Sequence, residues 1–169
     1  MIVNESNGNL LEINAKNDAG PEDFWEWRII TIEIPSLVNT KWKLVGIVDV
    51  KADDLTELEP KDCNECYTIT FDTDNTFDGQ TTINIIMGNY EIDYEAYTLR
   101  FTNMFMTAVG ELGDGYMYAK ILDKIQSFTI KDTYLHLYYN DNKNYLKYKK
   151  KEMAIALPAY HCLSPSIIY

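Results

Sequence analysis

Apolar and polar residues alternate along much of the chain between residues 41 and 149, which is the period of a β-strand with two unlike faces. The pattern is clearest in Tyr67–Phe71, Tyr134–Tyr139 and Tyr145–Lys149. Other strand-like runs are Phe24–Ile34, Lys41–Val50, Thr76–Phe77, Thr82–Met87, Tyr90–Asp93, Thr98–Phe101 and Phe128–Lys131. The sequence therefore predicts a mainly β domain built from antiparallel hairpins.

Turn residues separate these runs. Asp72–Asn75 is a turn signal, and the loop Asn140–Asn144 is rich in residues that tolerate positive φ. Two alternating strands around that loop predict a hairpin, in which Leu135 and Leu137 face Leu146 and Tyr148. Residues 51–62 are acidic and contain Pro60, so we expect a loop there. Gly88–Asn89 predicts a break between two strands.

One segment follows a helical period instead. Tyr118, Ile121, Leu122 and Ile125 recur at spacings of three and four, which makes a single apolar stripe. The pattern predicts one short helix of about three turns within residues 111–126, with Asp114 as its candidate N-cap.

The two ends of the chain differ from its centre. Residues 1–23 are polar and predict a partly ordered lead-in. The run Phe24–Ile34 fits a strand with a β-bulge at Ile29–Ile30, or alternatively a short helix beginning at Pro21. We therefore divide the chain into a lead-in with a candidate strand at 1–39, a β domain at 40–151 and a tail of uncertain order at 152–169.

Charge and composition narrow the function classes. The 169-residue chain carries a formal net charge of −11, so nucleic acid is an unfavourable partner. No run approaches the roughly 18 apolar residues of a membrane span. The basic run Lys147, Lys149, Lys150 and Lys151 is the local exception, and it predicts a charged sheet edge that discourages pairing with other sheets.

Few residues suggest chemistry. Cys63 and Cys66 fit a local disulfide, inert thiols or half of a zinc site. The other candidate zinc ligands are His136 and, in the tail, the adjacent His161 and Cys162. The segment Asp72–Gly79 lacks the spacing of a calcium loop. His136 lies opposite the leucines of its strand, which indicates a surface residue. We expect no catalytic residue, no cofactor and no bound metal.

A set of motifs recurs in a characteristic order between Thr40 and Lys149. They are Trp42-Lys43-Leu44, Ile69–Gly79, Asn84, Gly88-Asn89-Tyr90, Leu99-Arg100-Phe101, Met106-Thr107, Glu111 before the helix, Leu135-His136-Leu137 and Tyr145–Tyr148. This ordered set resembles the META domain (HslJ-like) family. Family members often have a cysteine just before the asparagine and another after Met-Thr, whereas Ile83 stands before Asn84 here and no cysteine closely follows Thr107. Thiol chemistry at those positions is therefore absent.

The resemblance implies a small antiparallel β-barrel or strongly curved sheet with one short helix, and a lipocalin-like barrel is the second choice. It also implies a bacterial cell-envelope lipoprotein without established catalysis, which acts as an interaction or structural module through unknown partners. The alternative is a lipocalin-like carrier of a small apolar ligand, with Trp42, Tyr90, Phe101 and Tyr148 as candidate ligand-lining residues. We expect membrane contact only through a lipid anchor outside this chain, with Asn4–Asp18 as a tether. A cytoplasmic protein is the alternative localisation.

Overall fold

The structure is a computed structural model, and it describes residues 5–6, 9–14, 28–32 and 35–152. Backbone contacts divide the chain into two units, Met1–Leu37 and Val38–Tyr169. The first unit contains a three-stranded antiparallel sheet of β1 (Glu5–Ser6), β2 (Asn9–Asn14) and β3 (Arg28–Ile32).

This sheet adds detail to one expectation for the lead-in and corrects another. Residues 1–23 were predicted to be partly ordered, and β1 and β2 lie within them; the polar and turn residues there obscure the short apolar run of β2. The register of β2 with β3 is continuous from Leu10 opposite Ile32 to Asn14 opposite Arg28. The predicted bulge at Ile29–Ile30 is therefore wrong. Residues 24–27, and the alternative helix from Pro21, lie outside the described residues.

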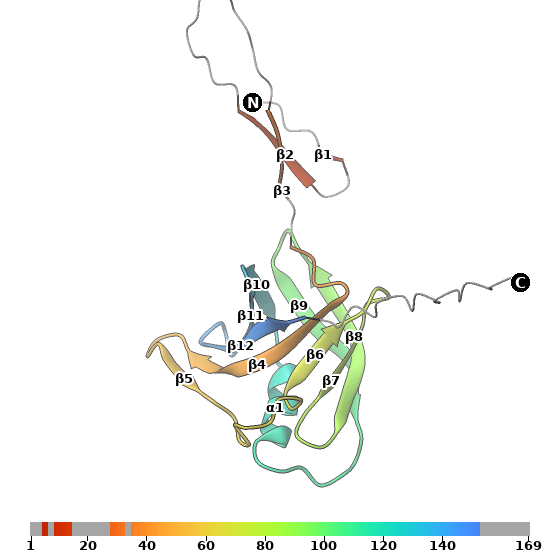
Figure 1. The fold of residues 1–169 in the computed structure, drawn as a ribbon, viewed down its shortest axis with the longest axis vertical. Helices are drawn as coiled ribbons and strands as arrows, with labels where there is room; N and C mark the ends of the chain where they lie inside the picture. The colour runs from red at the N-terminus through yellow and green to blue at the C-terminus, as the bar shows by residue number, and fades with distance from the viewer. Residues whose placement is uncertain (1–4, 7–8, 15–27, 33–34, 153–169) are drawn as a thin grey trace, which may run out of the picture. The chain divides into compact units, whose positions relative to one another are not determined.

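The second unit is an antiparallel sheet of nine strands with one short helix in its described part, which confirms the predicted fold class (Figure 1). The strands are β4 (Thr40–Asp49), β5 (Asp54–Thr56), β6 (Thr68–Phe71), β7 (Thr76–Gln80), β8 (Ile85–Asp93), β9 (Thr98–Met106), β10 (Ser127–Lys131), β11 (Tyr134–Tyr139) and β12 (Asn144–Lys151). The helix is α1 (Gly115–Leu122).

The sheet closes into a ring because β12 pairs with β4 along eight residues, from Asn144 opposite Asp49 to Lys151 opposite Lys41. Strand β5 lies outside the ring, paired with the end of β4. The thinnest join is between β9 and β10, where only Thr98 and Ser127 are ladder partners. Because β12 has a partner on each side, the lysine run does not protect a sheet edge, and that prediction is wrong.

The interior of the ring is filled by the apolar faces of its strands. The predicted hairpin is confirmed, with Leu137 opposite Leu146 and Leu135 opposite Tyr148, and all four side chains are fully buried. Other large buried side chains are Trp42, Ile69, Phe71, Phe77, Ile86, Tyr90, Leu99, Tyr118 and Leu122. An eight-stranded ring is just wide enough to be filled in this way.

Helix α1 spans eight residues, so it is shorter than the predicted three turns. After Leu122 the backbone makes hydrogen bonds to the residue three positions back rather than four: Lys124 N donates to Ile121 O, and Ile125 N donates to Leu122 O. Ile125 is nevertheless buried, which explains why the apolar period runs past the end of the helix. Asp114 makes no side-chain cap, because its Oδ2 accepts a hydrogen bond from Glu59 N at 2.8 Å.

Several strand boundaries differ from the prediction, and three of the differences are explained by local features. Strand β5 lies within the expected 51–62 loop. Strand β8 runs through Gly88 with a register shift rather than a break, since a Cβ at Gly88 would meet Thr102 O at 2.8 Å and glycine permits this close approach. Strand β6 begins at Thr68, because the preceding Tyr67 adopts a left-handed backbone with φ of 53° while its ring stays buried.

Candidate functional site

Three of the motif residues converge on one polar cluster at the β7–β8 connection. Asn84 is completely buried, and its amide makes four hydrogen bonds. Its Nδ2 donates to Val109 O at 2.8 Å and to Glu111 Oε1 at 2.6 Å. Its Oδ1 accepts from Thr107 Oγ1 and from Val109 N, both at 2.8 Å. Asn84 thereby joins the turn before β8 to the segment that follows β9.

Glu111 completes this cluster from the other side. The hydroxyls of Thr81 and Thr82 donate to its two carboxylate oxygens, and Ile83 N donates to Oε2 at 3.4 Å. Burial raises the pKa of Glu111, but the hydrogen bonds from Thr81, Thr82 and Asn84 outweigh that effect and hold the pKa below its usual value. The carboxylate is therefore a saturated acceptor, which suits a structural clamp better than a proton-transfer group.

We expect the hydrogen-bonded carboxylate of Glu111 to make the free energy of unfolding depend on pH in the acidic range. A carboxylate whose pKa is lowered by folding contributes stability above its unfolded pKa and loses it as the pH falls through the folded pKa. Between about pH 5 and pH 3, Glu111→Gln should flatten the fall in unfolding free energy relative to the unaltered protein. Urea unfolding across that range measures it. The control is Glu95→Gln, an exposed turn residue; equal slopes for the two variants would contradict the prediction.

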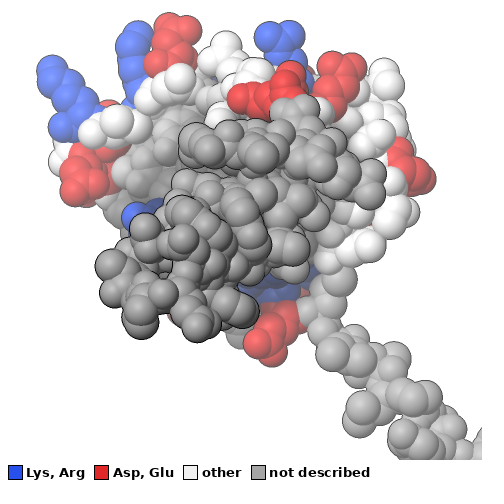
Figure 2. All heavy atoms as spheres, turned by 90° about the horizontal axis from the view of Figure 1, so that it is seen from above, with Lys and Arg blue, Asp and Glu red and all other residues white. Residues whose placement is uncertain are grey.

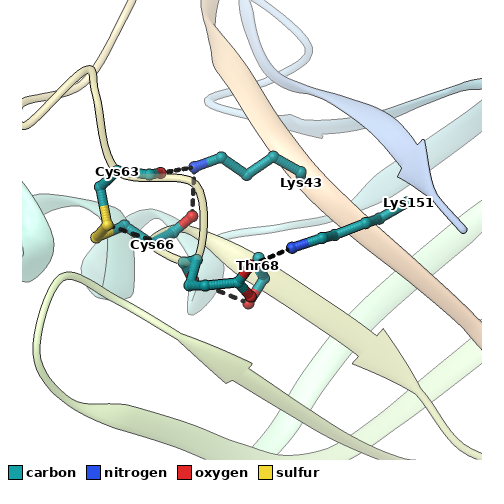
Figure 3. A network of polar contacts seen from close by, with 6 residues as sticks. Lys43, Cys63, Cys66, Thr68 and Lys151 are labelled. Atoms are coloured by element: carbon teal, nitrogen blue, oxygen red, sulfur yellow. Dashed lines mark hydrogen bonds and ion pairs between the residues drawn. A yellow bond between two sulfur atoms is a disulfide. The ribbon is translucent and has the colours of Figure 1, made fainter. Parts of the chain in front are cut away.

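A disulfide shapes the second polar cluster, on the loop before β6. Cys63 and Cys66 are bonded, as one of the sequence alternatives anticipated. Lys43, on β4, reaches this loop and donates from Nζ to the carbonyl oxygens of Cys63, at 2.9 Å, and of Cys66 (Figure 3). Lys151, on the adjacent β12, binds Glu65 Oε1 at 2.6 Å. The loop is therefore held from two neighbouring strands.

Lys151 lies close enough to Lys43 for its charge to affect the pKa of Lys43. Partial burial lowers the pKa of Lys43, and the charge of Lys151 lowers it further, while Glu65 opposes the shift. Lys43 Nζ also lies 5.5 Å from the centre of the Tyr67 ring. Burial raises the pKa of Tyr67 to about 12, so its hydroxyl stays protonated at neutral pH and donates to Glu59 O.

The candidate ligand-lining residues are all buried in the barrel interior. Tyr90 and Phe101 both pack against Phe71, with ring centres 5.1 and 6.1 Å apart. Trp42 Nε1 donates to Thr40 Oγ1, Tyr90 OH donates to Asp72 O, and Tyr148 OH donates to Tyr118 OH. Their polar tips are satisfied within the protein, so these residues pack as core. A ligand-lining role for them stays a prediction.

One open surface hollow of about 530 Å³ lies beside the β9–β10 join. Phe101 contributes to its wall, together with Arg100, Asp123, Lys124, Gln126 and Asn140. Its charges are mixed, so it does not select one sign of ligand. Acidic and basic side chains are also intermixed around the face shown in Figure 2.

The other candidate residues are not brought together as a site. His136 is half-buried and stacks on Tyr145, with ring centres 4.4 Å apart. In the Asp72–Gly79 segment, Asp74 accepts from Thr76 Oγ1 as part of a turn. Across the described residues, no three His, Cys, Asp or Glu side chains are grouped to hold a metal ion. His161 and Cys162 lie outside them.

The structure adds a role that the individual motifs did not reveal. Asn84, Thr107 and Glu111 are recognisable in the sequence, but the contacts between them depend on the fold. Thr81 and Thr82 were missed, and the signal that could have found them is a pair of hydroxyls beside Asn84.

Among the residues that the structure describes, none of the helical segments has the length and apolar character of a membrane span.

Comparison with known proteins agrees with these motifs. The profile of the META domain matches residues 35–152. A "Putative lipoprotein" of Tannerella forsythia is 31% identical over 120 residues, which covers 69% of this chain and 78% of the relative.

Two solved structures share the fold. A DUF4847 family protein from Bacteroides vulgatus has a TM-score of 0.53 and 15% identity, over 69% of this chain and 96% of its own. A protein from Burkholderia xenovorans has a TM-score of 0.56 and 16% identity, over 81% of this chain and 100% of its own. With the profile match and the motif residues together in the barrel, this chain belongs to the META domain family.

Proposed function

We propose that the protein is a non-catalytic bacterial cell-envelope lipoprotein that acts as an interaction or structural module. The observation that carries this proposal is the Cys63–Cys66 disulfide, because such bonds persist mainly in oxidising compartments outside the cytosol. The name of the Tannerella relative supports the same location and the lipid anchor.

The absence of catalysis is part of the proposal. In the Asn84–Glu111 cluster, the amide and the carboxylate are occupied by hydrogen bonds within the protein. Glu111 has a lowered pKa, whereas a general base at neutral pH needs a raised one. The dense aromatic interior likewise favours an interaction module over carriage of an apolar ligand, which would need room inside the barrel.

Fractionation of the bacterium that makes the protein tests this location. We expect an antibody against residues 38–152 to detect the protein in the envelope fraction, labelled by radioactive palmitate and with Cys63 and Cys66 protected from thiol alkylation. A cytosolic marker protein controls for leakage between fractions. Recovery in the cytosol, unlabelled and with both thiols reactive, would show that the proposal is wrong.

A further inference from the structure

The outer surface of two adjacent strands collects five lysines. On β12, Lys147, Lys149 and Lys151 alternate with the buried Leu146 and Tyr148. On β4, Lys41 and Lys43 alternate with the buried side chains of that strand. All five therefore point away from the barrel interior, and together they form what we call the lysine face.

The lysine face violates the usual rule of cross-strand pairing. Lys149 lies opposite Lys43, and Lys151 lies opposite Lys41. Like charges directly opposite each other on neighbouring strands are destabilising. Lys43 is held by the carbonyl oxygens of Cys63 and Cys66, and Lys151 is held by Glu65. Asp78 lies close enough to Lys41 for the lysine charge to lower the pKa of Asp78, but these contacts offset only part of the positive charge. In a chain of net charge −11, this concentration is a marked local reversal of sign.

Lysines of this face lower the pKa of two neighbouring groups. Burial lowers the pKa of His136, and the charge of Lys147 opposite it lowers that pKa further. Lys151 has the same effect on Lys43. Edge protection cannot account for these charges, because β12 is paired on both sides. Unfavourable local electrostatics of this kind are characteristic of a functional surface.

Aromatic rings continue the lysine face onto β11. Tyr134, His136 and Tyr138 occupy the outward positions of β11, opposite Lys149, Lys147 and Tyr145 respectively. Lys147 Nζ lies 5.0 Å from the centre of the Tyr134 ring, and the rings of Tyr138 and Tyr145 are centred 5.2 Å apart. The lysines of β12 are therefore spaced about 7 Å apart, beside a strip of partly exposed rings. We call this the aromatic strip; its residues are Tyr134, His136, Tyr138 and Tyr145.

We propose that the lysine face and this aromatic strip bind a linear anionic polysaccharide. Its carboxylates would pair chiefly with Lys147 and Lys149, which take no part in holding the Cys63–Cys66 loop, and its sugar rings would pack on the tyrosines. A narrow polymer contacts the stripe alone, whereas an anionic bilayer would also meet the acidic remainder of the surface. The disulfide argues against a cytosolic nucleic acid. The proposed envelope location supplies only the source of the polymer, so binding by purified protein tests this inference separately from the anchor.

Titration calorimetry with polygalacturonate fragments tests the proposal on the purified chain. We expect saturable binding in about 50 mM NaCl that weakens as salt is added. The double variant Lys147→Gln, Lys149→Gln should raise the dissociation constant for polygalacturonate roughly twentyfold, which is less than about tenfold for each lysine. Tyr138→Leu should weaken binding at unchanged net charge. The matched control is Lys51→Gln with Lys124→Gln, two exposed lysines off the lysine face, which should stay within about twofold.

Neutral dextran, phosphatidylglycerol vesicles and oligothymidylate complete the design. Thermal unfolding of each variant confirms that it is folded. The proposal is overturned if polygalacturonate does not bind, if both double variants lose affinity equally, or if vesicles or oligothymidylate bind more tightly than polygalacturonate. Binding of polygalacturonate that is impaired only by the lysine-face and Tyr138 variants supports it, whatever the fractionation shows about anchoring.

Discussion

Tyr118→Ala should lower the free energy of unfolding by about 4 kcal/mol, a value typical of truncating a large buried aromatic side chain. Tyr118 is the largest of the buried side chains of α1, with its ring centred 5.2 Å from that of Tyr67. Its hydroxyl also accepts a hydrogen bond from Tyr148 OH at 3.0 Å. Alanine would leave both a cavity and an unpaired buried hydroxyl. Because domains are typically stable by only 5–15 kcal/mol, this loss would be a large fraction of the total.

Urea unfolding followed by tryptophan fluorescence measures this cost. Tyr116→Ala is the matched control, because Tyr116 lies on the same helix and is 53% exposed, and it should cost less than about 0.5 kcal/mol. Tyr118→Phe separates the hydroxyl from the ring, and about 1 kcal/mol is expected for it. Similar losses from Tyr116→Ala and Tyr118→Ala would mean that α1 does not anchor in the barrel.

Asn84→Ala should cost about 3 kcal/mol, because it removes the centre of the polar cluster at the β7–β8 connection. The backbone N–H and C=O of Val109 would lose their hydrogen bonds to Asn84, and Glu111 and Thr107 would each lose one partner while keeping others. All four hydrogen bonds of one completely buried side chain would be lost together, and a typical protein hydrogen bond contributes about 0.5–1.5 kcal/mol. Chemical denaturation at neutral pH gives the value.

Asn89→Ala, on β8 just after this connection, is its control. Asn89 is only half-buried, and its side chain accepts a 3.3 Å hydrogen bond from Asn103, so its loss should cost less than about 1 kcal/mol. Equal costs at the two positions would remove the reason to treat Asn84 as the organiser of the cluster. A selective loss at Asn84 would explain physically why this asparagine belongs to the motif set.

Local patterns sufficed for most of the barrel strands. Leu135 and Leu137 alternate with polar residues, and that period alone identifies their strand and its inward face. Strand β5 escaped prediction because Asp54, Leu55 and Thr56 are all exposed and show no alternation; pairing with β4 defines it. The helix could be located from its stripe, but its end could not, since Ile125 keeps the apolar spacing in a non-helical turn.

Features that depend on distant pairing could not be read from the chain. The lysine run was interpreted as a sheet edge because nothing near Lys147 reveals that β4 lies alongside. The cluster of Asn84, Thr107 and Glu111 was visible only as separate motif residues, since their contacts require the β8–β9 pairing. Conversely, the aromatic residues chosen as ligand-lining have the alternation of a packed core, and alternation does not distinguish a filled interior from a hollow one.

Ring closure by β4 and β12 also has a consequence for biosynthesis. Lys41 and Lys151 are 110 positions apart in the chain (151 − 41), yet they are ladder partners. Forming such a contact requires closing a very long loop. The chain therefore loses conformational entropy before the contacts between β4 and β12 can stabilise it. While the chain is being translated, β4 can pair with β5 and β6, but its other side has no partner until the last barrel strand is made. The nascent domain therefore exposes an open strand edge throughout its synthesis, which is the period when a chaperone would protect it most.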